Sequence, residues 1–143
     1  MKATAPTLLQ GMRDVRLIEL PAHARDDGEV IVAEGADVPF ATVRMFIVRA
    51  AGAAERGNHA HRRCAQLMVC AHGAVDIVCD DGKEQRSFAL HRGNLALFVP
   101  PTIWTIVRFR DAGALVVLCD RGYEAEDYIR DHSQFLAMRK TAR

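Results

Sequence analysis

The chain has 143 residues, half of them hydrophobic, and its formal net charge is +1. This length is most simply one domain that buries a substantial core, and the hydrophobic content excludes a disordered protein. The balanced charge gives no reason to expect nucleic acid or an anionic membrane as a partner. No apolar run approaches the roughly 20 residues of a membrane span.

The N-terminal residues 1–6 lack the apolar stretch of a signal peptide. The chain has four cysteines, none in a CxxC pair, and three of them lie in apolar, strand-like runs. Buried free thiols are the simplest interpretation of such cysteines. Both observations favour a cytoplasmic protein.

The strands that we expect are short and follow one another closely. Asp80-Asp81-Gly82 is a strong hairpin signal, and Pro100-Pro101 must lie at a corner or an edge. Regular short strands are typical of a sandwich or a barrel, so we predict an all-β protein. In chain order the predicted strands cover 15–20, 29–33, 43–49, 66–70, 74–79, 86–90, 95–99, 105–109 and 115–119.

After the last of these strands the pattern changes. Tyr128, Ile129, Phe135 and Leu136 recur at roughly helical spacing among charged residues. We therefore predict a short C-terminal α-helix at about 124–139, with its apolar side packed on a core of about 12–122. No linker or repeat interrupts the chain, so we predict a single domain over residues 1–143.

Two histidines stand one residue apart in the segment Arg56-Gly57-Asn58-His59-Ala60-His61. Residues i and i+2 of a strand point to the same face, so His59 and His61 can project side by side into one cavity. Imidazole titrates near physiological pH. The pair therefore indicates a metal site or a proton-transfer site, with a purely structural role as the third interpretation.

The spacing around these histidines resembles the first cupin motif. In this chain it consists of His59-Ala60-His61, four further residues, Gln66, six further residues and Gly73. This resemblance covers roughly residues 40–120 and implies a cupin-type jelly-roll barrel with the histidines inside. A metal-binding cupin usually has Glu at the position of Gln66 and a third histidine at the position of Thr105. Two imidazoles and a neutral amide make a poor metal site, so we predict neither a metal nor another cofactor.

Further elements extend the resemblance over most of the chain. They are the segment from Arg56 to Arg62 with Gln66, then Asp81-Gly82, then Val99-Pro100-Pro101 with Trp104, then Tyr123 with Asp127-Tyr128-Ile129-Arg130-Asp131 and Phe135. Together they resemble the thymidine-diphosphate-sugar 3,4-ketoisomerase family, also described as the WxcM-like cupins. The first and last of these elements, in combination, are much more specific than a single cupin motif.

This resemblance implies a metal-free isomerase of deoxysugar biosynthesis. Its members convert a nucleotide-linked 4-keto-6-deoxyhexose, such as dTDP-4-keto-6-deoxyglucose, to the 3-keto isomer for glycans or natural products. The resemblance also implies a homodimer, often with exchanged N-terminal strands. The apolar strand predicted at 15–20 is a suitable element for such an exchange.

Moving a ketone from C4 to C3 needs a base for the acidic C3 proton, an enediol or enediolate, and a transfer of the hydroxyl proton from O3 to O4. By the resemblance, His59 is assigned to the carbon proton and His61 to the oxygen proton. Tyr123 and residues 127–131 are interpreted as structural anchors of the helix. The predicted substrate-binding residues are Arg56, Asn58, Arg44, Gln66, Trp104 and Thr105.

The chain departs from the family pattern at three places that the resemblance puts around the sugar. Asp27 stands where the family has arginine or tyrosine, and Thr105 stands where it has histidine or arginine. Met45-Phe46-Ile47 lacks the tyrosine of the family's aromatic strand. A different keto sugar, a different product configuration and a loss of activity all fit these changes.

Three functions therefore stay open. They are the ketoisomerase, a non-catalytic sugar-nucleotide-binding module, and a related enzyme such as a sugar-nucleotide 3- or 5-epimerase or a metal cupin. Epimerisation returns the proton to the same carbon from the opposite face, which suits one histidine and a phenolic acid. The missing tyrosine argues against it.

Overall fold

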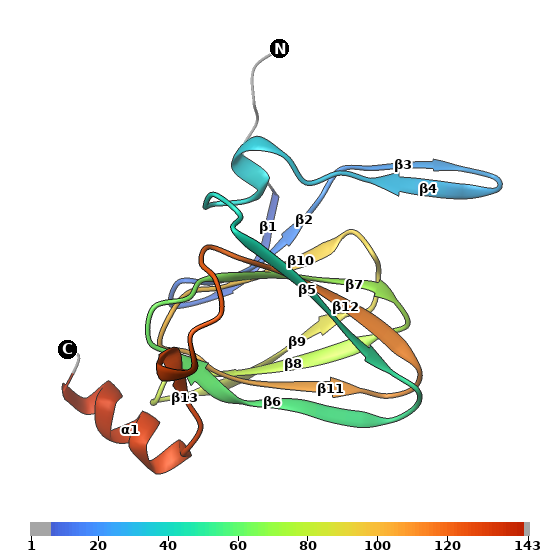
Figure 1. Ribbon diagram of the computed structural model, residues 1–143. Helices are drawn as coiled ribbons and strands as arrows, with labels where there is room; N and C mark the ends of the chain where they lie inside the picture. The colour runs from blue at the N-terminus through green and yellow to red at the C-terminus, as the bar shows by residue number, and fades with distance from the viewer. Residues whose placement is uncertain (1–6, 142–143) are drawn as a thin grey trace.

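The computed structural model describes residues 7–141, which form two antiparallel sheets that lie face to face (Figure 1). The first sheet contains, in spatial order, β1 (Thr7–Met12), β2 (Val15–Glu19), β10 (Leu95–Val99), β7 (Gln66–His72), β12 (Gly113–Cys119) and β5 (Arg44–Ala50). The second contains β13 (Tyr128–Ile129), β6 (Ala54–His61), β11 (Trp104–Phe109), β8 (Val75–Asp80) and β9 (Gln85–Leu90).

The remaining elements lie outside this sandwich. β3 (Ala22–Arg25) and β4 (Gly28–Ile31) form a separate hairpin that projects from one end of the molecule (Figure 1). Two 3-10 turns, η1 (Gly35–Asp37) and η2 (Ala125–Asp127), and the helix α1 (His132–Thr141) complete the chain. The predicted all-β jelly roll with a C-terminal helix is confirmed, although the two sheets remain a sandwich and do not close into a barrel.

Alternation along the strands explains why the sheets face each other. In β12, Leu115, Val117 and Cys119 are buried while the residues between them are partly exposed. Because successive strand side chains point to opposite faces, one face of each sheet becomes apolar and must be covered. The main core lies between the two sheets, and a smaller cluster around Ile18, Leu20 and Leu67 covers the outer face of the first sheet.

The C-terminal segment differs from the prediction. The helix begins at His132, and the segment before it forms η2 and the short strand β13. Asp131 explains the later start, because its Oδ1 accepts the backbone N–H of Gln134 (3.0 Å), as an N-cap residue does. Tyr128 and Ile129 instead pair with His61 and Ala60 at the free edge of β6.

The structure also shows the state of the cysteines and the lengths of the helices in residues 7–141. All four cysteines are buried and free of disulfides, as predicted. Between residues 7 and 141, no helix has the length and hydropathy needed to cross a bilayer.

Candidate active site

A bulge in β6 sets the direction of the histidines. The pairing register with β11 shifts between Thr105, which faces His59, and Ile106, which faces Gly57. Gly57 and Asn58 both have positive φ, 85° and 60°, and a Cβ on Gly57 would lie 2.9 Å from the carbonyl oxygen of Thr105. Glycine is therefore required here, and the bulge presents the following residues to the space between the sheets.

The two histidines meet in this space together with a tyrosine from β13. The ring centroids of His59 and His61 are 5.1 Å apart, and Tyr128 lies 5.0 Å from His59 and 4.4 Å from His61. His61 is buried and His59 is partly exposed. The predicted side-by-side pair is therefore present, and a phenol stands beside it.

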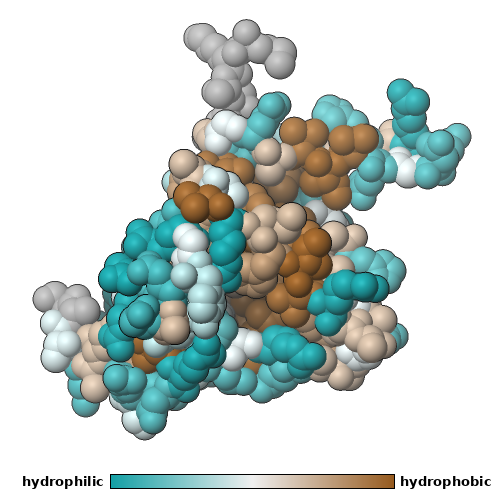
Figure 2. Space-filling view, in the orientation of Figure 1, coloured by the Kyte–Doolittle hydropathy of each residue, from teal (hydrophilic) through white to brown (hydrophobic). Residues whose placement is uncertain are grey.

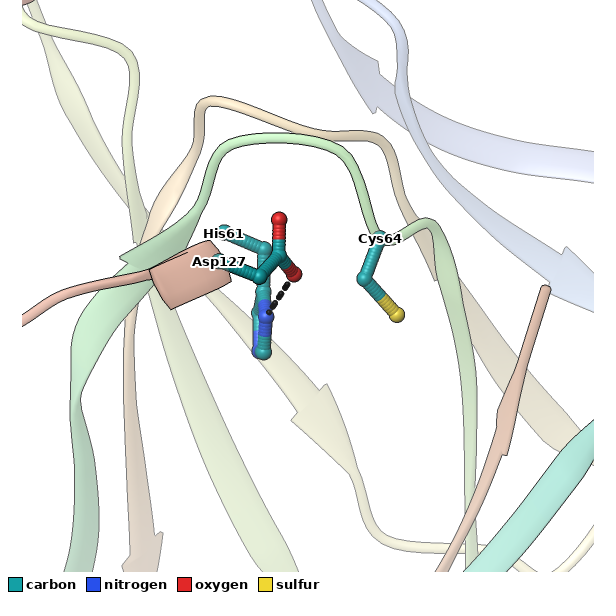
Figure 3. A group of neighbouring side chains, drawn as sticks. All are labelled: His61, Cys64 and Asp127. Atoms are coloured by element: carbon teal, nitrogen blue, oxygen red, sulfur yellow. Dashed lines mark hydrogen bonds and ion pairs between the residues drawn. The ribbon is translucent and has the colours of Figure 1, made fainter. Parts of the chain in front are cut away.

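Asp127 forms a hydrogen bond with the imidazole of His61. Its Oδ2 lies 2.9 Å from Nδ1 of His61, and its Oδ1 accepts the backbone N–H of Arg63 at 2.7 Å. Figure 3 shows the carboxylate of Asp127 directed at the imidazole, with Cys64 farther along the loop. Because Asp127 is itself only 3% exposed, this arrangement is a buried carboxylate–imidazole pair, not a surface contact.

The hydrogen bonds fix the tautomer of His61. An ionised carboxylate can only accept, so a neutral His61 must carry its proton on Nδ1 and its lone pair on Nε2. Nε2 of His61 and Nδ1 of His59 are both buried, and neither has a hydrogen-bond partner within residues 7–141. Buried polar atoms almost always have a hydrogen-bond partner, so these two nitrogens are the atoms of the site that a bound substrate would contact.

Both imidazoles are held neutral. Burial lowers the pKa of His59 to about 4, with additional effects from His61 and Arg130. Burial also lowers the pKa of His61, although the hydrogen bond to Asp127 partly opposes this shift. The pKa of Asp127 is lowered despite its burial, because His61 and the backbone N–H of Arg63 stabilise the carboxylate. At neutral pH the site therefore offers two neutral bases and one fixed anion.

This electrostatic state predicts an unusual pH profile. A histidine with an ordinary pKa near 6.5 loses its basic form below that pH. We expect kcat/KM to stay constant down to a pH below this ordinary value, because the base must be neutral in the free enzyme to accept a proton. The pKa values of both imidazoles are lowered, to about 4 for His59, so the expected midpoint lies below 6.5. Steady-state assays combined with circular dichroism at each pH measure it, and a midpoint near 6.5 in folded protein would contradict the geometry.

The opposite wall of the site comes from the first sheet. Arg44 and Gln66 flank Cys119, which pairs with both of them across neighbouring strands. Gln66 lies with its Nε2 3.8 Å from the sulfur of Cys119. The guanidinium of Arg44 lies 5.5 Å from the ring of Tyr123. Two sequence-predicted residues, Arg44 and Gln66, thus face the histidines across the interior.

Arg44 brings a permanent positive charge to this interior. Burial lowers its pKa, but hydrogen bonding to Tyr128 and the nearby Cys119 outweigh burial, so the net shift is upward. Its charge also contributes to the lowered pKa of His61. A cation so close to the two bases can stabilise an anion that forms beside them.

Of the other predicted binding residues, one lies beside the histidines and two are exposed to solvent. Thr105 is buried opposite His59 and belongs to the site. Arg56 is exposed and its guanidinium donates to the carbonyl of Glu55 at 3.2 Å. Asn58 is also exposed and donates to the carboxylate of Glu55 at 3.1 Å. Both side chains thus bond to Glu55 within the described part of the chain, and their role in binding stays a prediction.

Trp104 does not join the site. It is one residue before Thr105 in β11 and therefore points to the opposite face of the sheet. There its ring lies 5.7 Å from that of Phe135 and 4.9 Å from that of His132, under α1. The predicted contact with sugar or base is replaced by a contact that seats the helix.

Asp27 likewise lies away from the histidines of its own chain. It occupies the turn of the β3–β4 hairpin, where every residue from Ala22 to Val30 is exposed (Figure 1). The resemblance placed this position in the sugar pocket. Within one chain, Asp27 does not reach that pocket.

Sequence reasoning missed three residues of the site, all from the segment that was interpreted as a helix anchor. Asp127 orients His61, Tyr128 packs on both histidines, and Arg130 stacks over Tyr128 with its guanidinium carbon 4.4 Å from the ring centroid. The available signal was the segment Asp127–Asp131 itself. It is part of the family resemblance, and its polar residues are more than a helix anchor needs.

His61, Cys64 and Asp127 are close enough to raise the question of a metal. One potential ligand atom of each lies within 4.8 Å of the others. However, Nδ1 of His61 is engaged by Asp127, and the thiol of Cys64 donates to the carbonyl of Ala65 at 3.4 Å. Hydrogen bonding with Cys119 and burial raise the pKa of the Cys64 thiol, which opposes the thiolate form that metals bind. The three groups fit a hydrogen-bonded network better than a metal site.

Comparisons with known proteins agree with this geometry. The family model FdtA (WxcM-like, C-terminal) matches residues 13–140. The TDP-4-oxo-6-deoxy-alpha-D-glucose-3,4-oxoisomerase of Aneurinibacillus thermoaerophilus is 31% identical over 108 residues, which are 74% of this chain and 78% of that protein.

Two solved structures show the same fold at similar identity. A 3,4-ketoisomerase from Helicobacter canadensis superposes with a TM-score of 0.84 at 30% identity, covering 90% of this chain and 99% of that one. A mutant of the 3,4-ketoisomerase QdtA from Thermoanaerobacterium thermosaccharolyticum, in complex with TDP-4-keto-6-deoxyglucose, gives 0.85 at 25%, covering 92% and 98%. On the extent of these matches, the chain belongs to the FdtA family of WxcM-like proteins.

Proposed function

We propose that this protein is a sugar-nucleotide 3,4-ketoisomerase that converts dTDP-4-keto-6-deoxyglucose to a dTDP-3-keto-6-deoxyhexose. The observation that carries the proposal is the pair of buried, unpartnered ring nitrogens on His59 and His61. Relatives that are named 3,4-oxoisomerase or 3,4-ketoisomerase support it. The reaction moves protons only, and two neutral imidazoles are sufficient for that.

The structure favours His61 as the base that takes the carbon proton, the reverse of the sequence-based assignment. His61 carries its lone pair on Nε2 and is backed by the carboxylate of Asp127, which stabilises the imidazolium as it forms. His59 has no acidic partner recorded among the described residues, and its pKa is lowered to about 4. It is therefore better suited to pass a proton between the two oxygens.

The proposed steps balance without a redox partner. Nε2 of His61 removes the C3 proton, the C3–C4 bond becomes double, and the carbonyl electrons move to O4. His59 transfers the hydroxyl proton from O3 to O4. The enediolate then collapses to a C3 ketone as C4 takes a proton from His61. The positive charge of Arg44 stabilises the enediolate.

An epimerase remains the second candidate because of Tyr128. The sequence lacks a tyrosine in β5, but β13 supplies a phenol 4.4 Å from His61 and 5.0 Å from His59, measured between ring centroids. Epimerisation needs an acid besides the base, and this phenol is the acid that the site offers. The non-catalytic binding module is the third candidate, and the same experiment separates all three.

A proton NMR time course tests the proposal. Purified protein is mixed with dTDP-4-keto-6-deoxyglucose in deuterated buffer. Loss of the C3 proton signal together with a new 3-keto species is expected, and the C4 coupling gives the product configuration. Exchange without net isomerisation would replace the proposal with the epimerase or another substrate. Line broadening without exchange would replace it with the binding module.

The protein is further proposed to act as a cytoplasmic homodimer. Val43, Met45 and Ile47 are exposed by 65%, 54% and 53% on the outer side of the edge strand β5 and the residue before it. Figure 2 shows apolar residues gathered over this face. An apolar edge of this kind favours burial against a second copy. Analytical ultracentrifugation is expected to give twice the chain mass, and a monomer at micromolar concentration would contradict this.

A further inference from the structure

A cleft lies away from the histidines, between α1, the β8–β9 turn and the turn that joins β1 to β2. Its volume is about 390 Å³. Arg13 contributes from the β1–β2 turn, Lys83 from the β8–β9 turn, and Arg139 and Lys140 from the end of α1. Four cationic side chains therefore line one cleft, against the single carboxylate of Asp81.

The carboxylate of Asp81 is already occupied. Its Oδ1 accepts the backbone N–H groups of Lys83 and Glu84 at 2.8 and 2.9 Å. Its Oδ2 accepts Nε of Arg13 at 3.1 Å. Asp81 thus closes its own turn and pairs with one arginine, and the other three cations lack a carboxylate partner among residues 7–141.

Among these cations, Arg139 lacks a hydrogen-bond acceptor within residues 7–141 for part of its guanidinium. Its Nε donates to the carbonyl of Asp81 at 2.7 Å, and its Nη1 donates to Oγ1 of Thr102 at 2.9 Å. Its Nη2 is buried and has no hydrogen-bond partner in the described part of the chain. Burial and the nearby charge of Arg13 lower the pKa of Arg139, and the carboxylates of Asp81, Asp14 and Asp80 oppose this shift only in part. A buried guanidinium N–H without an acceptor is costly, so an acceptor is missing here.

Capping of the helix does not account for this arginine. Basic residues at a helix C-terminus are normally favoured because they interact with the last carbonyl groups and the helix dipole. The guanidinium of Arg139 instead bonds to Asp81 and Thr102, which belong to other elements. Gly82 permits this close approach, since a Cβ there would lie 2.8 Å from Cβ of Arg139.

We propose that this cleft binds a small oxyanion of the phosphate class. The guanidinium presents several N–H groups in one plane, a geometry that matches phosphate oxygens, and it needs the acceptor that phosphate supplies. Lys83 and Lys140 are exposed and have no ion-pair partner within residues 7–141, so they can close over the anion. The site is independent of the ketoisomerase proposal.

Isothermal calorimetry with inorganic phosphate tests the proposal, with chloride at equal ionic strength in the reference. The Lys83→Ala/Lys140→Ala double variant is expected to bind phosphate about tenfold more weakly, and Arg139→Lys, which keeps the charge but loses the planar fork, is also expected to bind more weakly. The Arg25→Ala/Arg49→Ala double variant loses the same charge at exposed positions elsewhere and is the matched control. It is expected to change affinity less than about twofold.

Absence of saturable phosphate binding would overturn the proposal, and so would equal losses in the test and control pairs. A titration with TDP identifies the source of the phosphate group. A second TDP site that disappears in the Lys83→Ala/Lys140→Ala variant shows that the cleft takes the phosphates of a nucleotide. A single TDP site unaffected by these substitutions, with phosphate binding still weakened, shows that it takes the free anion.

Discussion

Replacing His61 by asparagine is expected to abolish exchange of the C3 hydrogen with solvent and to lower kcat by about 10²–10⁴, the usual contribution of a general base. Asparagine keeps a side chain of similar length but offers no nitrogen lone pair. The C3 proton signal of dTDP-4-keto-6-deoxyglucose in deuterated buffer measures the exchange directly. Substrate binding should persist, because the cation of Arg44 and the phenol of Tyr128 are unchanged.

His59→Asn is the matched control for this prediction. If His59 carries only the oxygen proton, C3 exchange continues in this variant while the 3-keto product fails to accumulate. The opposite pattern, with exchange lost in His59→Asn and kept in His61→Asn, would restore the assignment made from the sequence. Exchange that survives undiminished in both variants would contradict the histidine mechanism.

Asp127→Asn is expected to lower kcat by about 10²–10⁴ with little change in KM, by analogy with other carboxylates that set the tautomer of a catalytic imidazole. The amide N–H₂ of asparagine donates to Nδ1 of His61 and drives the histidine proton to Nε2, which removes the base. Its amide oxygen can still accept the backbone N–H of Arg63, so the loop after β6 should keep its structure. Asp127 thus acts as a positioning residue.

Asp131→Asn, four residues along the same segment, is the control for this substitution. Asp131 is exposed and caps α1, and asparagine is an equally good N-cap. Its kcat and melting temperature should stay close to those of the wild type. Equal losses of kcat in the two variants, or a change confined to KM in Asp127→Asn, would argue against the positioning role.

Strand alternation and turn chemistry were sufficient to predict most of the sandwich. The nine predicted strands correspond to β2, β4, β5 and β7 to β12. The histidine pair was predictable for the same reason, because residues two apart share a face of a strand. Alternation alone does not tell which of two neighbouring residues in a strand faces the interior. Trp104 and Thr105 are adjacent, and only the pairing of Thr105 with His59 shows which of them faces the interior.

Strand alternation could not predict the C-terminal part of the site, which contains Asp127 and Tyr128. A strand of two residues has no measurable period, so Tyr128 and Ile129 were absorbed into a predicted helix. Their position depends on the unpaired edge of β6, a tertiary feature that local sequence does not reveal. The buried contact of Asp127 with His61 spans 66 residues of sequence and was invisible for the same reason.

That long-range contact has a consequence for the order in which the protein folds. Contacts between residues distant in sequence carry a large loop-closure cost and tend to form late. The segment that brings Asp127 to His61 continues into α1, whose Phe135 covers Trp104, the only tryptophan of the chain. The maturation of the site and the burial of the indole are thus two effects of the docking of one segment. A chain can therefore have every other strand of the sandwich in place and still lack the carboxylate that orients its base, and the intrinsic fluorescence of the chain distinguishes the two states.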